Sequence, residues 1–136
     1  RTQVVFVGRS NVGKSSLVNF LLNRKALAST SATPGHTKQF HLFAVNEKQG
    51  GLGPPSFRLV DVPGIGYAEA AEQKQDSWRG LLQRYLARRE PLKLVCHLVD
   101  ARHKVTAADK EVCAYVSMSR GTAPFRYAIL LTKGDK

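Results

Sequence analysis

The stretch FVGRSNVGKSSLVNFLL, residues 6–22, decides the fold. An apolar run leads into a segment with two glycines, a lysine and serines, and an apolar pattern with helical spacing follows at once. Residues 8–15 satisfy G-x-x-x-x-G-K-[ST], with a predicted strand before the motif and a predicted helix after it. The glycines let successive backbone N–H groups point at phosphate oxygens, and the helix N-terminus adds partial positive charge. The stretch therefore predicts a phosphate-binding loop for a nucleoside triphosphate rather than a plain glycine turn.

Two side chains of this loop have predicted chemical roles. Lys14 is expected to reach the β- and γ-phosphates, and the Ser15 hydroxyl is expected to bind Mg²⁺. The residues of the loop that we expect to contact the nucleotide are Gly8, Arg9, Ser10, Asn11, Val12, Gly13, Lys14, Ser15 and Ser16.

Strand-like and helix-like segments alternate along the 136 residues. Strands are predicted over 2–8, 38–45, 57–62, 92–100 and 125–132, and helices over 14–23, 72–90 and 106–119. A Gly/Pro-rich turn region over 46–56 joins the second strand to the third, which predicts an antiparallel pair. The other strands alternate with helices, a pattern typical of a mostly parallel sheet with helices on both faces. The sequence predicts one α/β domain of the P-loop NTPase fold, with one antiparallel edge strand.

Helical spacing also predicts which side chains face the core. The first helix places Leu17, Phe20 and Leu21 on one side. The helix over 72–90 has one apolar stripe, formed by Trp78, Leu81, Leu82, Tyr85 and Leu86. This spacing favours core packing over the alternative that Trp78 and Tyr85 stack on RNA bases. Four arginines lie mainly off the stripe and are candidate RNA contacts, with a solvated helix face as the alternative: Arg79, Arg84, Arg88 and Arg89.

The net charge is the unusual bulk property. The chain has 21 Lys and Arg against 10 Asp and Glu, a net charge of +11, and its pI is about 10.1. Such a balance favours a polyanionic partner, most often nucleic acid, over a merely basic solvated surface. Cys96 and Cys113 lie in apolar segments without metal-ligand spacing, which indicates reduced core thiols and an intracellular protein. No apolar run approaches the roughly 18 residues of a membrane span, so no membrane partner is expected.

The choice of base is indicated near the end of the chain. Thr132-Lys133-Gly134-Asp135 follows a predicted strand, where open α/β sheets bind ligands. The Asp135 carboxylate can accept from the N1–H and the exocyclic amine of guanine together, whereas adenine lacks these donors. The aliphatic stem of Lys133 can lie over the base. The motif therefore predicts GTP rather than ATP, and a P-loop kinase or ATPase is disfavoured.

Between the two motifs lie the candidate metal and γ-phosphate contacts. Asp61 ends an apolar strand, the position from which a carboxylate reaches Mg²⁺ through water. The backbone N–H of Gly64 can meet the γ-phosphate. Thr37 is the predicted second Mg²⁺ hydroxyl, ordered only with triphosphate bound, and Thr30 and Thr33 are alternatives.

These motifs, in this order, resemble the EngB family of ribosome-biogenesis GTPases within the Era/TrmE/EngA-like P-loop GTPases. Residues 8–17 read GRSNVGKSSL as in that family, and residues 33–37 read TPGHT, with His36 where arginine is common. Residues 61–68, DVPGIGYA, are similar to the second switch of the family, D-[LV]-P-G-Y-G-Y-A. LVDARH over 98–103 also looks like this family, and the resemblance covers essentially the whole chain.

The resemblance implies a small-GTPase G domain over 1–136 that acts as a Mg²⁺-dependent switch in assembly of the large ribosomal subunit. The implied partner is a precursor of that subunit, through its rRNA or its proteins, and the protein is expected to be monomeric. The two switches are expected to contribute further GTP contacts from Pro34, Gly35, His36, Thr37, Pro63 and Gly64. The alternatives left open are a GTPase in another RNA process, such as tRNA modification, and a non-hydrolysing structural GTP binder.

The family continues past residue 136 into a further strand and helices, so the sequence resembles a fragment with a truncated C-terminus. The length of the 46–56 region favours a mitochondrial or plastid protein over a bacterial cytoplasmic one.

A low rate of hydrolysis is expected. Many small GTPases place a glutamine directly after D-x-x-G to orient water, but this chain has Ile65, which can neither donate nor accept. Catalysis must then depend on Lys14, Thr37 and Gly64 together with Mg²⁺. Asn11 is a candidate K⁺ ligand beside the phosphates, as in some members of the wider class; the alternative is that it bonds only the loop.

Overall fold

The computed structural model describes residues 2–9, 12–22, 41–45, 56–62, 72–87, 91–120 and 124–135. The described residues form β1 (Gln3–Val7), α1 (Lys14–Leu21), β2 (His41–Val45), β3 (Phe57–Asp61), α2 (Glu72–Leu86), β4 (Leu92–Asp100), α3 (Ala107–Arg120) and β5 (Arg126–Thr132). Each element corresponds to a segment that the sequence predicts, with bounds that differ at the ends. Residues 46–55, most of the Gly/Pro-rich turn, lie outside the described residues.

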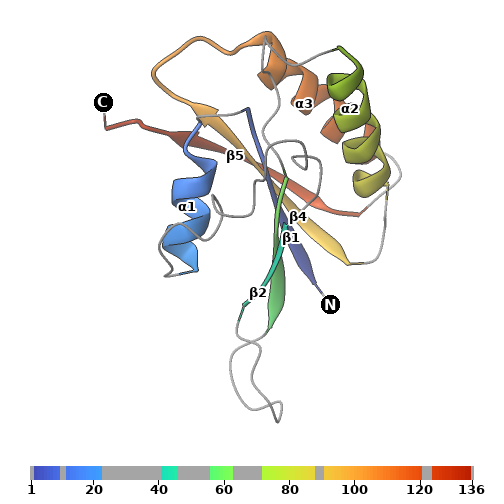
Figure 1. Cartoon of the computed structure of the whole chain (residues 1–136). Helices are drawn as coiled ribbons and strands as arrows, with labels where there is room; N and C mark the ends of the chain where they lie inside the picture. Colours follow the sequence, from blue (N-terminus) through green and yellow to red (C-terminus); the bar gives the residue numbers. More distant parts are fainter. Residues whose placement is uncertain are drawn as a thin grey trace.

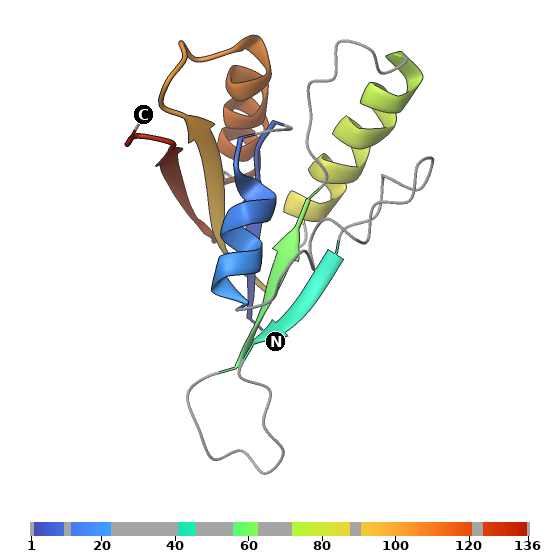
Figure 2. The same cartoon turned by 60° about the vertical axis from the view of Figure 1, so that its left-hand side comes forward.

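The strands form one sheet in the order β2-β3-β1-β4-β5. β1 is parallel to β3 and to β4, β4 is parallel to β5, and the edge strand β2 is antiparallel to β3. Helix α1 covers one face of the sheet, and α2 and α3 cover the other (Figures 1 and 2). The predicted mostly parallel sheet with one antiparallel edge strand and helices on both faces is confirmed.

Each face of the sheet has its own core, because side chains alternate along a strand. On β1, Val5 and Val7 belong to the core shared with α2 and α3, whereas Phe6 belongs to the core shared with α1. A strand buried on both faces reads as a continuous apolar run, which explains why the sequence shows no alternation there. The carboxyl ends of β1, β3, β4 and β5 meet at one edge of the sheet, because these strands are parallel.

The orientation predicted for the first helix is wrong in part. Lys14 and Val18 are its buried residues and Leu17 packs against the core, but Phe20 is 81% exposed and Leu21 is 50% exposed. Successive residues of an α-helix are about 100° apart, so Phe20 lies about 200° from Val18 and faces away from the sheet. The apolar composition of this helix concealed which face packs.

Three residues of the stripe predicted for α2 pack in the core, whereas Leu81 is half-buried and belongs to neither core. Leu82 and Leu86 are fully buried, and the hydroxyl of buried Tyr85 donates to Gln3 Oε1 at 2.6 Å. Tyr85 is therefore a core residue, as predicted. The side chain of Trp78 lies outside the described residues.

Helix α3 begins where the sequence predicts. The Asp109 N–H donates to Thr106 Oγ1 at 3.1 Å, and the Thr106 N–H donates to Asp109 Oδ2 at 2.9 Å. This reciprocal pair is a capping box with aspartate in the third position, and it supplies partners for two N–H groups at the helix start.

Both cysteines are free thiols, with Cys96 buried and Cys113 half-buried. Burial raises the pKa of the Cys96 thiol. Among the described residues, no helix has the length and apolar character needed to span a bilayer.

Candidate nucleotide site

Two glycines shape the loop between β1 and α1. A Cβ on Gly8 would lie 3.0 Å from both the Leu98 carbonyl oxygen and Val12 Cγ1, so the backbone of β4 approaches too closely for a larger residue. Gly13 has a φ of 98°, in the left-handed region, and is the N-cap of α1. Gly8 is thus favoured by the close approach of β4, and Gly13 by its left-handed backbone.

The loop lysine and the carboxylate at the end of β3 form a buried ion pair. Lys14 Nζ donates to Asp61 Oδ1, and the two residues are only 8% and 4% exposed. The pair forms because β3 runs parallel to β1, with the Val62 N–H donating to the Phe6 carbonyl at 3.2 Å. Each charge compensates the desolvation of the other, since a lone buried charge is strongly unfavourable. The predicted phosphate ligand and the predicted metal ligand are therefore neighbours.

The oxygen donors at this edge fit Mg²⁺. Asp61 supplies a carboxylate, and Ser15 is an exposed hydroxyl in the first turn of α1, directly after Lys14. Across the described ranges, no group of three or more His, Cys, Asp or Glu side chains could hold a metal ion. Mg²⁺ suits such a sparse set, because it binds through one or two protein oxygens and takes phosphate and water as its other ligands.

The base motif is joined directly to the phosphate loop. Thr132 Oγ1 donates to the Val12 carbonyl at 2.6 Å and lies 3.3 Å from the Val99 carbonyl. The Ala101 N–H donates to the Thr132 carbonyl at 2.9 Å. Residues 120 positions apart are thus bonded to each other, because β5 and β1 end at the same edge with β4 between them.

Lys133 follows with a left-handed backbone, its φ being 59°. A Cβ on Gly13 would lie 3.9 Å from Lys133 Cε, so the stem of this lysine runs beside the phosphate loop. Asp135 is exposed, two residues further along the same turn. A left-handed conformation is uncommon for a residue other than glycine and persists where its surroundings hold it.

Sequence reasoning missed the charge at the end of β4. The Asp100 side chain is 2% exposed and lies within 4 Å of four basic groups: Arg9, Arg102, His103 and Lys133. The hydrogen bonds from Arg102 hold the pKa of the Asp100 carboxyl well below its usual range. The available signal was the aspartate that ends the apolar run LKLVCHLVD and precedes Ala-Arg-His.

The remaining predicted contacts divide into two groups. Val12 is buried, and the Ser16 side chain is exposed on α1. The predicted contacts that lie outside the described residues are Ser10, Asn11, Pro34, Gly35, His36, Thr37, Pro63 and Gly64. Ile65 and the alternatives Thr30 and Thr33 also lie outside. Their predicted roles stay predictions.

The predicted basic face of α2 needs a correction. Arg79 is half-buried and forms an ion pair with Glu111 of α3, so its charge is already balanced within the fold. Arg84 is exposed, as expected for a surface contact, and Arg88 and Arg89 lie outside the described residues. Helical spacing identified residues off the apolar stripe, but α2 packs beside α3, which supplies the acidic partner.

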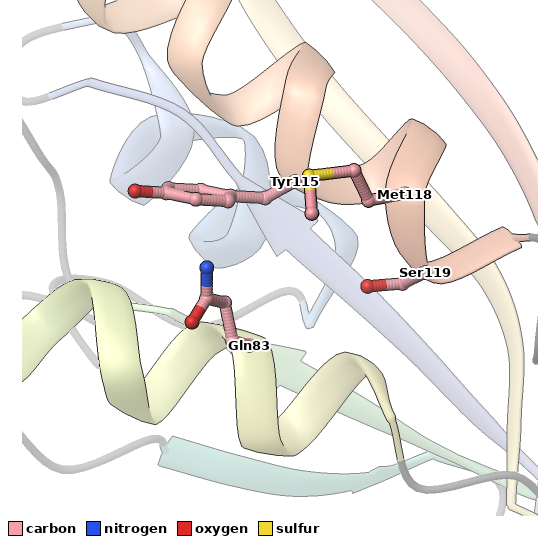
Figure 3. Close-up of a pocket in the computed structure, with 4 residues that line it drawn as sticks. All are labelled: Gln83, Tyr115, Met118 and Ser119. Carbon is pink, nitrogen blue, oxygen red and sulfur yellow. The ribbon is translucent and has the colours of Figure 1, made fainter.

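A small hollow lies elsewhere, between α2 and α3 (Figure 3). It is lined by Gln83 of α2 and by Tyr115, Met118 and Ser119 of α3, and its volume is about 270 Å³. Ligand pockets usually exceed about 300 Å³ and enclose most of their ligand. This hollow has no residue in common with the loop motifs, so the edge of the sheet described above is the candidate nucleotide site.

Three comparisons with known proteins agree. The family model described as 50S ribosome-binding GTPase matches residues 3–133. The chain is 47% identical over 135 residues to a probable GTP-binding protein EngB of Mesorhizobium japonicum, covering 98% of this chain and 62% of that protein. It is 44% identical over 138 residues to a probable GTP-binding protein EngB of Clostridium botulinum, covering 100% and 63%. The chain therefore spans less than two thirds of these curated relatives.

Solved structures share the fold. A crystal structure of a probable GTP-binding protein engB superposes with a TM-score of 0.67 at 19% identity, covering 99% of this chain and 72% of that one. Era of Aquifex aeolicus, crystallised with GDP and AlF4⁻, superposes with a TM-score of 0.69 at 23% identity, covering 98% and 41%. The predicted resemblance to EngB proteins and the predicted G-domain fold are confirmed.

Proposed function

Because the chain belongs to the family of 50S ribosome-binding GTPases, we propose that it binds GTP with Mg²⁺, hydrolyses it slowly, and acts as a switch in assembly of the large ribosomal subunit. Two contacts support the proposal. The buried Lys14–Asp61 pair and the Thr132–Val12 hydrogen bond bring the loop after β1, the carboxylate at the end of β3 and the end of β5 to one edge of the sheet.

Phosphate binding in this proposal is an exchange of partners. Lys14 would leave the Asp61 carboxylate for the β- and γ-phosphate oxygens, and the Asp61 carboxylate would then hold Mg²⁺ through water. Ser15 supplies the hydroxyl ligand from the start of α1. Bound Mg²⁺ neutralises charge on the phosphates. Each buried charge would therefore have a partner both before and after the nucleotide binds. Before binding, Lys14 and Asp61 neutralise each other.

Base selection falls to the turn after β5. Asp135 accepts from the two guanine donors, and Lys133 places its stem over the base. The bond from Thr132 to the Val12 carbonyl fixes the distance between this turn and the phosphate loop. A base and its phosphates would thus be held by two loops that are hydrogen-bonded to each other.

Hydrolysis is slow because Ile65 cannot orient water. Lys14, Thr37 and Gly64 stabilise charge on the γ-phosphate together with Mg²⁺. Thr37 and Gly64 are held in place by the γ-phosphate, and therefore only in the triphosphate form. Asn11 is a further proposed ligand, for K⁺.

The proposed partner is a precursor of the large ribosomal subunit, bound through rRNA or ribosomal proteins inside the cell, in the bacterial cytoplasm or in an organelle. The net charge of +11 supports an RNA-rich partner. Exposed Arg84 is the described residue of α2 best suited to contact phosphate. Another RNA process, such as tRNA modification, is the second candidate, because the same charge serves any RNA.

Gradient sedimentation of the full-length protein with its ribosomes tests this proposal. We expect the protein to travel with large-subunit precursors in the presence of a non-hydrolysable GTP analogue and to leave them with GDP. An ATP analogue is the control and should behave like no nucleotide. Association with particles in every nucleotide state would contradict a switch and favour a structural GTP binder.

A further inference from the structure

Asp100 lies between the two loops of the nucleotide site without belonging to either. It is the last residue of β4, which has β1 on one side and β5 on the other (Figure 1). The phosphate loop follows β1, and the base motif follows β5. Asp100 is in register with Thr132, the residue that bonds the phosphate loop. A side chain at this position can reach both loops.

Arg102 fixes the carboxylate in place. Its Nε lies 3.1 Å from Oδ1, its Nη2 lies 2.9 Å from Oδ2, and its backbone N–H donates to Oδ1 at 3.0 Å. Two side-chain bonds from one guanidinium, together with a backbone bond, define both the position and the plane of the carboxylate. Asp100 therefore presents a fixed negative charge at this edge.

Three further basic groups share that charge, each 3.8 Å from Oδ2: Arg9 Nη2 of the phosphate loop, Lys133 Nζ of the base motif, and His103 Nε2. Arg9 depends on it in particular, because its Nε is buried and has no hydrogen-bond partner among the described residues. The stem of Lys133 runs beside Gly13, and its backbone has the left-handed φ noted above. One carboxylate is thus the common counter-charge of residues from both loops.

We propose that Asp100 is a positioning residue of the nucleotide site, whose charge holds Arg9 and Lys133 and so sets the phosphate loop and the base motif relative to each other. This inference rests on the proposed function and goes beyond it, because the proposed function gives Asp100 no role.

Loss of the Asp100 charge should separate the loops. Asp100→Asn keeps the shape of the side chain but leaves Arg9, Arg102 and Lys133 close together without the negative charge of Asp100. Like charges at such distances repel, and the repulsion is relieved when Arg9 and Lys133 move apart. Both loops then lose the arrangement that binds base and phosphates together.

The experiment measures the affinity of the full-length protein for fluorescent GDP and, in parallel, its thermal unfolding. We expect Asp100→Asn to bind GDP roughly 10- to 100-fold more weakly, by analogy with the loss seen when a residue that orients a metal ligand is replaced. Asp109→Asn is the matched control, since Asp109 is an equally buried aspartate that caps α3. It should change GDP affinity less than about twofold.

A double-mutant cycle separates positioning from general damage to the fold. Lys133→Met removes the ammonium but keeps the stem. If Asp100 acts through Lys133, the double variant should bind GDP about as well as the weaker single variant. The inference would be overturned if the fold-loss of GDP affinity in the double variant equals the product of the two single-variant losses. It would also be overturned if Asp100→Asn binds GDP within twofold of the wild type.

Two further outcomes distinguish a failure of this inference from a folding defect and from a failure of the proposed function. If Asp100→Asn does not fold, Arg102→Gln loosens the carboxylate without deleting it and should weaken GDP binding about threefold to tenfold; an unchanged affinity would overturn the inference. If the wild-type protein itself shows no preference for GDP over ADP, the proposed function fails. Normal wild-type binding with an unaffected Asp100→Asn variant contradicts the positioning role alone.

Discussion

Two buried aspartates, Asp61 and Asp100, end the two strands that flank β1, and they have different surroundings. Asp61, on β3, has Lys14 as its single basic partner among the described residues. Asp100, on β4, is fixed by Arg102 and surrounded by three more basic groups. A one-to-one pair can exchange partners when a ligand brings equal and opposite charges. A carboxylate that balances several cations cannot be released without leaving them to repel each other. Sheet position therefore brings both carboxylates to the site, and the number of partners decides which of them can take part in binding.

Breaking the Lys14–Asp61 pair should have the largest effect. We expect Lys14→Ala to weaken triphosphate binding by roughly a hundredfold or more, because a buried charge-paired contact to phosphate is lost. The free energy of unfolding should fall by about 3 kcal/mol, since Asp61 is left buried without a cation. Nucleotide titration and urea unfolding measure the two effects.

The matched variant removes both charges. Lys14→Met combined with Asp61→Asn should recover most of the stability but none of the binding. Equal stability losses in the single and double variants would contradict an exchangeable ion pair.

Asp135→Asn tests the other side of the site. The amide should lower GTP affinity by at least about tenfold, because one guanine donor then faces another donor. Xanthine nucleotides, whose C2 carbonyl and N1–H suit an amide, should bind the variant better than the wild type. Competition between the two nucleotides measures the shift, and an unchanged guanine preference would show that Asp135 does not contact the base.

His97 of β4, the strand that Asp100 ends, should have a smaller effect, on how the free energy of unfolding depends on pH. His97 is buried and its Nδ1 lies 2.7 Å from the Tyr127 hydroxyl of β5. Burial lowers the pKa of His97, and the charge of Asp109 opposes this only in part. The unfolded chain therefore takes up a proton below about pH 6.5 that the folded chain does not bind. The free energy of unfolding should fall as the pH drops from about 7.5 to 5.5.

His97→Gln should reduce this pH dependence, as measured by urea unfolding at a series of pH values. If the wild type and the variant lose stability in parallel, the buried histidine is not the titrating group.

How far the sequence predicts this molecule depends on whether a feature is local. The strand ends that bear Asp61 and Thr132 follow from apolar runs and their order, and parallel strands then bring their carboxyl ends together. The ion pair of Arg79 does not follow, because Glu111 meets it only when α2 packs beside α3. The role of Asp100 was likewise hidden, since its partners come from three separate loops. Exposed Phe20 shows the same limit, because an apolar helix does not reveal which face it buries.

The smallest predicted effect uses two arginines of α2 as a matched pair. Arg84→Gln should reduce the slope of log affinity against log salt for ribosomal precursors by about one, because one phosphate contact is lost. Arg79→Gln should leave the slope unchanged, since Arg79 is paired with Glu111. Binding to purified particles over a salt series measures both. If Arg79→Gln changed the slope more than Arg84→Gln does, Arg79 rather than Arg84 would be the phosphate contact.

The central claim is that this edge of the sheet binds a guanine nucleoside triphosphate with Mg²⁺, through a Lys14–Asp61 pair that exchanges partners. Calorimetric titration of the full-length protein with GTP and with ATP, each with and without Mg²⁺, tests it most directly. We predict that GTP binds at least about a hundredfold more tightly than ATP and that Mg²⁺ strengthens GTP binding in the wild type but not in Asp61→Asn. Equal affinity for the two nucleotides, or a Mg²⁺ effect that survives in Asp61→Asn, would contradict it.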